Sequence, residues 1–139
     1  MENRVFLDTS FAIALSVESD AHHNHALELS EQLEAENTRL ITTTAILLEI
    51  GNALSKKRYR QAAAELLISL EQDKTIEIVP ITDELYQKAF ELFCKRPNKD
   101  WCLIDCMSFI VMRENDLSQA LTTDEHFEQA GFVTLLRHK

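Results

Sequence analysis

The chain has 139 residues, of which 45% are hydrophobic and 27% charged, and its net charge at pH 7 is −9. This balance is typical of one folded domain and excludes an intrinsically disordered chain. No apolar run approaches the roughly 20 residues that cross a bilayer, and the first residues lack the long apolar stretch of a secretory signal. We therefore expect a single cytoplasmic domain over residues 1–139 that has no membrane partner.

The negative charge also bears on nucleic-acid binding, because proteins that bind nucleic acids usually carry a basic surface. Acidic nucleases exist because metal ions in their sites supply positive charge beside the phosphate. A net charge of −9 therefore predicts weak nonspecific binding of RNA, or a partner that helps to hold the substrate.

Strands and helices are predicted in alternation from the first residues onward. A strand is expected at residues 4–8, where three apolar residues run together before Asp8 ends the run. Thr9 and Ser10 then favour a helix start, because a side-chain oxygen there can accept from free backbone N–H groups. Apolar spacing predicts the following elements: a helix to residue 15, a helix at 22–35, a strand at 39–42, helices at 45–57 and 61–71, and a strand at 75–79.

The second half of the chain continues the alternation. The expected elements are a helix from Thr82 or Asp83 to Cys94, a loop at 96–99, an apolar helix at 103–113, a strand at 119–122, a helix at 124–129 that Gly131 stops, and a strand at 132–136. The pattern predicts an α/β fold in which helices cover both faces of a mainly parallel sheet of four to five strands.

Two acidic residues follow predicted strands. Asp8 comes after VFL and Asp124 after ALTT. In open parallel sheets the ligand crevice lies beyond the carboxyl ends of the strands. If both strands are central, these two carboxylates converge.

Two further acids interrupt apolar helices. Glu49 lies within AILLEIGNAL and Asp105 within WCLIDCMSFIVM, and neither has a basic residue at i±3 or i±4 in its helix. An ionised carboxylate in such a setting is costly unless it is paired, hydrogen-bonded or bound to a metal. Four carboxylates suit Mg²⁺ or Mn²⁺ rather than zinc. The simpler alternative is that each acid is a helix cap or a solvated residue, and this competes best for Asp124.

Four segments carry a family resemblance: FLDTSFAIAL, LLEIGNALSKKRYR, KDWCLIDCMSFIVM and ALTTDEHFEQAGF. Each one alone is a weak signal, but together they occur in the family's order and span residues 5 to 132. In this respect the chain resembles the PIN domains, and within them the VapC-type toxins of toxin–antitoxin pairs.

The resemblance implies a PIN-like three-layer fold and hydrolysis of RNA with Mg²⁺ or Mn²⁺, leaving 5′-phosphate and 3′-hydroxyl ends. It also implies an antitoxin partner and a homodimer. Carried over by position, the expected metal site consists of Asp8, Glu49, Asp105 and Asp124, and the hydroxyls that line it come from Thr9 or Ser10 and from Thr122.

The third segment departs from the family pattern. Members often have Asp-Lys-x-Trp-Ser-x-Thr-Asp where this chain has NKDWCLID. Asn98 therefore stands in place of the first acid, and Cys102 and Ile104 stand in place of the two hydroxyl residues. Asp100 offers a replacement for the missing charge two positions later. The departures concern a fifth acid and the support of Asp105, and leave the four main carboxylates in place.

Other residues have two interpretations. A basic cluster either contacts the RNA backbone or places favourable charge at a helix C-terminus; it consists of Lys56, Lys57, Arg58 and Arg60. Trp101 either stacks on a base or belongs to the core.

We predict no functional role for the histidines and the cysteines. The helix-start histidines are interpreted as solvated and His126 as a surface residue, although His126 is close enough to Asp124 to approach a phosphate. The three cysteines are expected to be reduced core residues, because their number is odd and no CxxC pair occurs. The residues concerned are His22, His23, His25, Cys94, Cys102 and Cys106.

Three other functions compete with this interpretation. A haloacid-dehalogenase-like phosphatase needs a second aspartate two positions after the first, where this chain has Ser10. A receiver-like signalling domain needs a pair of adjacent acids near the first strand and a lysine after the last one, and neither is found. The alternative that remains is a catalytically silent PIN-like scaffold that binds RNA or a protein.

Overall fold

The computed structural model describes residues 2–138, so the two ends of the expected domain, residues 1 and 139, lie outside it. Its centre is a parallel sheet of five strands in the order β3-β2-β1-β4-β5. The strands are β1 (Arg4–Leu7), β2 (Arg39–Thr43), β3 (Ile76–Val79), β4 (Gln119–Leu121) and β5 (Val133–Thr134).

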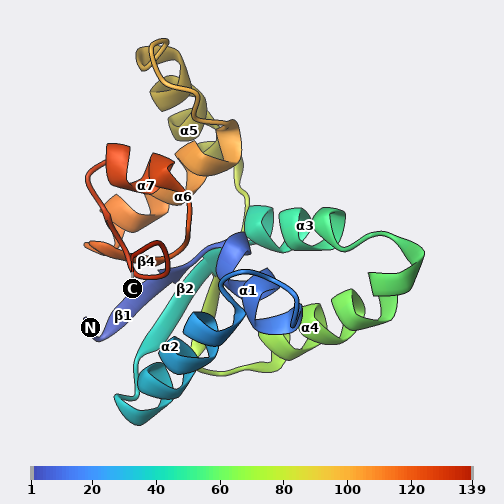
Figure 1. Cartoon of the computed structure of the whole chain (residues 1–139). Coiled ribbons are helices and arrows are strands. Elements are labelled where there is room, and N and C mark those ends of the chain that lie inside the picture. Colours follow the sequence, from blue (N-terminus) through green and yellow to red (C-terminus); the bar gives the residue numbers. More distant parts are fainter. Residues whose placement is uncertain (1, 139) are drawn as a thin grey trace.

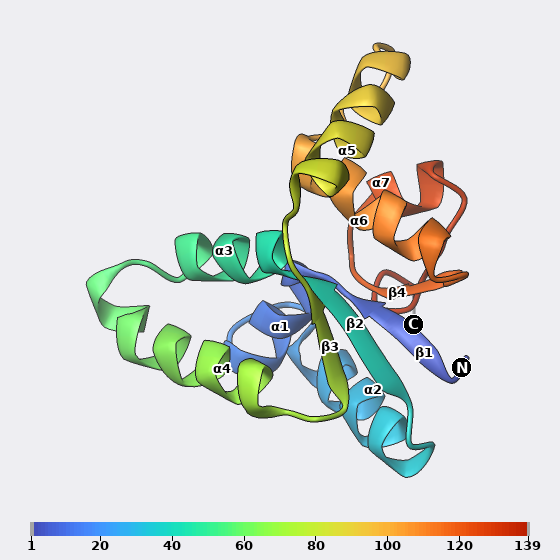
Figure 2. The same cartoon turned by 180° about the vertical axis from the view of Figure 1, so that it is seen from behind.

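Helices flank this sheet in two groups, as Figures 1 and 2 show. Helices α1 to α4 lie together on one side of the sheet, and α5 to α7 lie together on the other side. The helices are α1 (Thr9–Ser16), α2 (His23–Ala35), α3 (Thr44–Ala53), α4 (Arg60–Gln72), α5 (Asp83–Lys95), α6 (Leu103–Glu114) and α7 (Glu125–Gln129). The expected three-layer α/β fold is confirmed. Within residues 2–138 no helix has the length and apolar character needed to cross a membrane.

The core is built around the first strand. Val5 and Phe6 of β1 are fully buried, because parallel strands with helices on both faces expose neither side. Phe127 of α7 packs against Phe6 at 6.1 Å and edge-on against Phe109 of α6 at 5.0 Å between ring centroids. These aromatic contacts join the sheet to α6 and α7.

The chain reverses its direction of travel across the sheet at β1. It moves from β1 to β2 and β3 on one side, and then returns to place β4 and β5 on the other. Such a reversal opens a crevice at the carboxyl ends of the two central strands. Asp8 and Asp124 follow these strands, so the expected convergence of the two ends is confirmed.

Some predicted boundaries are wrong. The helix expected at 45–57 ends at Ala53, because the chain turns there and a short 3₁₀ helix, η1 (Lys57–Tyr59), precedes α4. The Arg60 guanidinium donates to the Ser55 carbonyl at 3.0 Å and closes this turn. The last strand is shorter than expected because the chain turns again after Thr134.

The prediction that the cysteines belong to the core is confirmed for one of the three. Cys106 is buried, whereas Cys94 and Cys102 are exposed. All three are free thiols, as expected.

Candidate active site

Asp8 is a buried carboxylate at the end of the central strand, and its exposed fraction is 8%. The Thr122 hydroxyl donates to its Oδ2 at 2.7 Å, and the Ser10 hydroxyl donates to the same atom at 3.2 Å. Burial raises the pKa of Asp8 to about 6, although the bond from Thr122 lowers it; the charges of Glu49 and Asp124 raise it further. A neighbouring positive charge would therefore stabilise the ionised form.

Glu49 reaches the same region from the middle of α3. It is half-buried, and its carboxylate accepts a hydrogen bond from the Thr9 hydroxyl. Thr9 and Ser10 do begin a helix, but Asp8 occupies the N-cap position and no side chain caps the helix. The two hydroxyls donate to acidic residues instead, Thr9 to Glu49 and Ser10 to Asp8.

Asp105 lies in the first turn of α6 rather than in its interior. Its Oδ2 accepts from the Cys102 N–H at 3.1 Å, and the Cys102 Sγ accepts from the Asp105 N–H at 3.4 Å. This reciprocal pair is a capping box, and the helix N-terminus also favours a negative charge. The thiol thus fills the place of the missing hydroxyl, and the cost of burying Asp105 is smaller than the sequence indicated.

Asp124 and His126 lie at the start of α7. The Asp124 carboxylate caps this helix by accepting from the His126 N–H at 2.8 Å, and the Asp124 N–H donates to the Thr122 hydroxyl at 3.0 Å. The His126 Nδ1 lies 2.9 Å from Asp105 Oδ2 and 3.5 Å from Asp124 Oδ1. Asp124 is therefore a helix cap and a member of the acidic group at once.

The prediction of His126 as a surface residue is wrong. Its side chain is 24% exposed and faces two carboxylates. Burial lowers the pKa of His126, but the hydrogen bond to Asp105 and the charges of Asp124 and Asp105 raise it more, so the net direction is upward. The signal in the sequence was its position two residues after an acid that caps a helix.

These contacts define one acidic group, in which some side chains lie closer together than others. Among residues 2–138, one set of three possible ligands has all its atoms within 4.8 Å of one another, namely Asp105, Asp124 and His126. Asp8 is joined to this set through Thr122, which bonds to both aspartates. The carboxylate oxygens of this group fit Mg²⁺ or Mn²⁺.

Two residues of the segment that departs from the family pattern, Asn98 and Asp100, stay outside this group. Asn98 and Asp100 are exposed, and within the described part of the chain neither has a hydrogen bond to the four acids. Trp101 is 5% exposed, packs edge-on against Phe109, and its indole N–H donates to Gln129 at 3.0 Å. It is a core residue and is not available to stack on a base.

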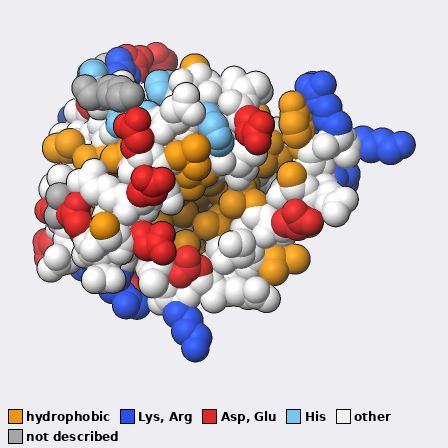
Figure 3. Space-filling view, turned by 60° about the horizontal axis from the view of Figure 1, so that its bottom comes forward, with side chains coloured by type: hydrophobic (Ala, Val, Ile, Leu, Met, Phe, Trp, Pro, Cys, Tyr) orange, Lys and Arg blue, Asp and Glu red, His pale blue; other side chains and the backbone are white. Residues whose placement is uncertain are grey.

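The basic cluster lies at the tip of the α3–α4 hairpin. All four side chains are exposed, and Arg60 is the first residue of α4. The cluster lies after α3, which ends at Ala53, and Lys57 and Arg58 belong to the short helix η1. Figure 3 shows Lys and Arg side chains projecting at the right-hand end of the molecule, where Figure 1 places this hairpin tip.

The histidines near α2 form no metal group within residues 2–138. They are half-buried rather than fully solvated, and the His23 Nδ1 lies 2.7 Å from the Ala14 carbonyl oxygen.

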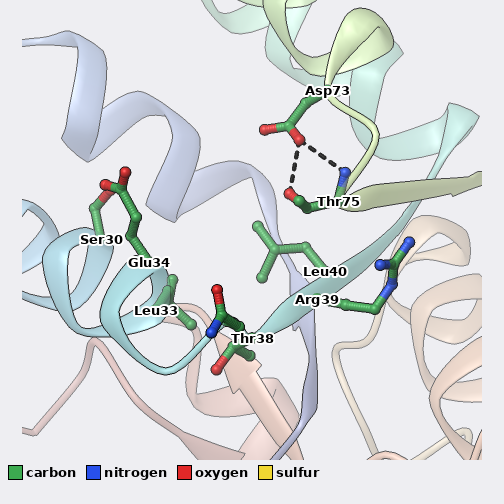
Figure 4. A pocket seen from close by; sticks show the side chains of 9 residues that line it. Ser30, Leu33, Glu34, Thr38, Arg39, Leu40, Asp73 and Thr75 are labelled. Carbon is green, nitrogen blue, oxygen red and sulfur yellow. Dashed lines mark hydrogen bonds between the residues drawn. The ribbon is translucent and has the colours of Figure 1, made fainter.

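A cleft of about 520 Å³ does not coincide with the acids. Leu33, Arg39 and Asp73 line it, beside the amino ends of β2 and β3 (Figure 4). There Asp73 accepts from the Thr75 N–H at 2.8 Å and hydroxyl at 2.6 Å, which forms a turn. Since the acids lie at the opposite, carboxyl ends of the strands, we place the candidate active site with them.

Comparison with known proteins agrees with this fold. A PIN-domain family model matches residues 5–133. The 23S rRNA-specific endonuclease VapC20 of Mycobacterium tuberculosis is 28% identical over 129 residues, which is 93% of this chain and 95% of that protein. The crystal structure of VapC20, described as a Sarcin-Ricin loop cleaving toxin, superposes with a TM-score of 0.81 at 27% identity and covers 93% of this chain and 96% of that one.

A more distant solved structure shares the fold. VapBC2 from Rickettsia felis, bound to a DNA fragment from its promoter, matches with a TM-score of 0.62 at 17% identity and covers 94% of this chain and 96% of that one.

Proposed function

The chain belongs to the PIN-domain family, and we propose that residues 1–139 form one nuclease domain that hydrolyses RNA phosphodiester bonds as a metal-dependent endoribonuclease. The observation that carries the proposal is the arrangement of acids at the carboxyl ends of β1 and β4. There Thr122 bonds to Asp8 and Asp124, and His126 bonds to Asp105. The VapC20 relative supports RNA as the substrate, and a 23S rRNA fragment is the first RNA to test.

The acids would hold a divalent ion, Mg²⁺ or Mn²⁺. We assign Asp105 and Asp124 to direct binding of the ion. We place Asp8 beside them, because it bonds to Thr122, and Glu49 at the margin of the site, because it bonds to Thr9. When bound, such an ion supplies positive charge that activates water and stabilises charge on the scissile phosphate.

The chain's own residues then have separate tasks. Thr122 and Ser10 hold the Asp8 carboxylate in one orientation, since both hydroxyls donate to Oδ2. Thr9 orients Glu49 in the same way from the start of α1. Preorganised side chains of this kind need no rearrangement at the moment of reaction.

RNA approaches a protein whose net charge is −9. We propose that the hairpin-tip residues Lys56, Lys57, Arg58 and Arg60 contact the RNA backbone, because four exposed positive charges gather there on a protein that is otherwise acidic. Lys and Arg contacts to phosphates give sequence-independent affinity.

The proposed partners are an antitoxin and a second copy of the chain, in the cytoplasm. The toxin description of the VapC20 relative supports the antitoxin. An exposed aromatic stripe on α5 supports the homodimer: Tyr86, Phe90 and Phe93 are 41–43% exposed, whereas Leu85 and Leu92 of the same helix are buried. Apolar patches of this kind mark protein interfaces.

The test is cleavage of a mixed RNA pool with an added 23S rRNA fragment, in Mg²⁺, Mn²⁺ or EDTA. The purified protein is compared with Asp8→Asn and with the control Asp20→Asn. The Asp20 carboxylate accepts a backbone N–H from His22, a bond that an asparagine oxygen can also accept. We expect metal-dependent cleavage by the unaltered protein and the control, and a loss of at least about a hundredfold in Asp8→Asn.

Cleavage that persists in EDTA and in Asp8→Asn would contradict the proposed site. Binding of RNA without cleavage in any metal would instead favour the silent scaffold.

A further inference from the structure

A histidine nitrogen points between two carboxylates of the acidic group. The His126 Nδ1 lies 2.9 Å from Asp105 Oδ2 and 3.5 Å from Asp124 Oδ1, and the three ligand atoms share a space less than 4.8 Å across. No other set of three such side chains within residues 2–138 is as close. The ring therefore occupies the densest part of the candidate site.

The core holds this histidine in place. The next residue, Phe127, is fully buried and packs edge-on against Phe109 of α6 at 5.0 Å, which fixes α7 against the helix that carries Asp105. The His126 N–H donates to Asp124 Oδ1 at 2.8 Å, so the backbone of the histidine is also tied to the second carboxylate. The position of the His126 backbone is thus fixed, and its ring lies against the Asp105 and Asp124 carboxylates.

The spacing of the three atoms fits one coordination sphere. Metal–ligand bonds of about 2.1 Å in octahedral geometry place adjacent ligands about 3 Å apart and opposite ligands about 4 Å apart. The separations of 2.9 and 3.5 Å between the His126 Nδ1 and the two carboxylate oxygens lie in that range. A cation between the atoms needs only small side-chain movements.

Imidazole changes which cation such a site prefers. Mg²⁺ takes oxygen ligands almost exclusively, whereas first-row transition ions also bind imidazole nitrogen. We propose that His126 is a direct metal ligand together with Asp105 and Asp124, and that this mixed nitrogen–oxygen site binds Mn²⁺ in preference to Mg²⁺. The inference rests on the metal-dependent nuclease proposed above and names its cofactor.

The competing role for His126 is local charge compensation. A histidine that only neutralises the two carboxylates would leave an incoming ion bound through oxygen alone. In that case removing the ring leaves the Mn²⁺ environment unchanged, and the two roles are separated by detecting nitrogen in the coordination sphere.

The experiment measures metal binding without RNA. Electron spin-echo envelope modulation of the Mn²⁺-loaded protein reports ¹⁴N coupling from a bound imidazole, and calorimetric titration gives the Mn²⁺ and Mg²⁺ affinities. The variants are His126→Gln and, as a second ligand change, His126→Asp. The control His138→Gln removes a histidine that pairs with Glu128 rather than with the acidic group.

We expect ¹⁴N coupling in the unaltered protein and in His138→Gln, and none in either His126 variant. In His126→Gln the Mn²⁺ affinity should fall by about tenfold or more and the Mg²⁺ affinity by less than about threefold. His126→Asp should retain Mn²⁺ through oxygen and lose the preference over Mg²⁺.

Mn²⁺ that binds without ¹⁴N coupling, or coupling that survives in His126→Gln, would overturn the proposal, as would the absence of any Mn²⁺ binding. The RNA assay tests the nuclease separately. If the protein cleaves RNA with metal but the Mn²⁺ environment is the same in the His126 variants, the proposed histidine ligand is wrong and the proposed nuclease activity stands.

Discussion

At the scale of single residues, Asp8 connects the first strand to the far end of the chain. Its carboxylate is buried, receives two hydroxyl hydrogen bonds and lies near the charges of Glu49 and Asp124. The residue is thus held in place while its ionised form is destabilised. A bound cation resolves this conflict, and without one the folded protein carries the cost.

That cost predicts a pH dependence of stability in the absence of divalent metal. The pKa of Asp8 is about 6 in the folded protein against 3.8 for the free group. As pH rises from about 4 to 6, the unfolded carboxyl loses its proton before the folded one does, so the free energy of unfolding falls. The total decrease is on the order of 3 kcal/mol, and the contribution stays constant above that window.

Urea unfolding in EDTA at several pH values measures this effect. Asp8→Asn has no titrating carboxyl at this position and should lose the corresponding part of the decline between pH 4 and 6. An identical pH profile in the variant and the unaltered protein would show that Asp8 ionises normally.

The sequence predicted single residues best where one segment carried the information. Asp8 and Asp124 follow apolar strands, and their convergence needed only the sheet rule. The contact of His126 with Asp105 depends instead on how α7 packs against α6, and the position of His126 two residues after Asp124 indicates only its nearness to Asp124. The capping box at Cys102 was also missed, because sulfur is a weak acceptor and an unusual N-cap.

At the scale of elements, the α3–α4 hairpin separates two charge environments. Glu49 lies at the acidic group in the middle of α3, and the exposed basic residues lie beyond the end of that helix. The Arg58 guanidinium rests over the Tyr59 ring at 4.7 Å, and Arg60 bonds to the Ser55 carbonyl. Helix periodicity predicted both helices but overran the end of α3, since the charged turn contains no glycine or proline to mark it.

The hairpin tip is expected to contribute RNA affinity through phosphate contacts. In the triple variant Lys56→Gln, Lys57→Gln and Arg58→Gln, the slope of log affinity against log salt concentration should decrease in magnitude by about 2, because each phosphate contact contributes about 0.7 for single strands. Unfolding free energy should change by less than about 0.5 kcal/mol, since the side chains are exposed. Binding of labelled RNA to an Asp8→Asn background, measured over a salt series, gives the slope.

The control carries the same charge change elsewhere on the surface, in the triple variant Lys74→Gln, Lys95→Gln and Lys99→Gln. Equal losses of slope in the two triple variants would show that only net charge matters and that the tip makes no particular contact.

At the scale of the whole molecule, Phe127 connects the layers that meet at the site. It is fully buried and touches Phe6 of β1 and Phe109 of α6. The same contacts set the distance between His126 on α7 and Asp105 on α6. Stability and site geometry therefore depend on one side chain that takes no part in the chemistry.

Phe127→Ala should destabilise the protein by about 3–5 kcal/mol, because it removes buried apolar contacts and leaves a cavity among the rings. Ile68→Ala is the control, since Ile68 on α4 is 54% exposed and lies outside the proposed dimer surface on α5, and it should cost less than about 1 kcal/mol. Urea unfolding at one fixed protein concentration measures both. Similar losses in the two variants would contradict the central position of Phe127.

The order of the strands also has a consequence for synthesis of the chain. Strand β1 pairs with β2 early in the sequence, but its other neighbour, β4, begins at Gln119. A nascent chain can therefore form the β1–β2–β3 half of the sheet on the ribosome while Thr122, Asp124 and His126 are still unmade. The acidic group is assembled only when β4 joins β1, so the growing polypeptide has no complete site until the segment from Gln119 to His126 has been made.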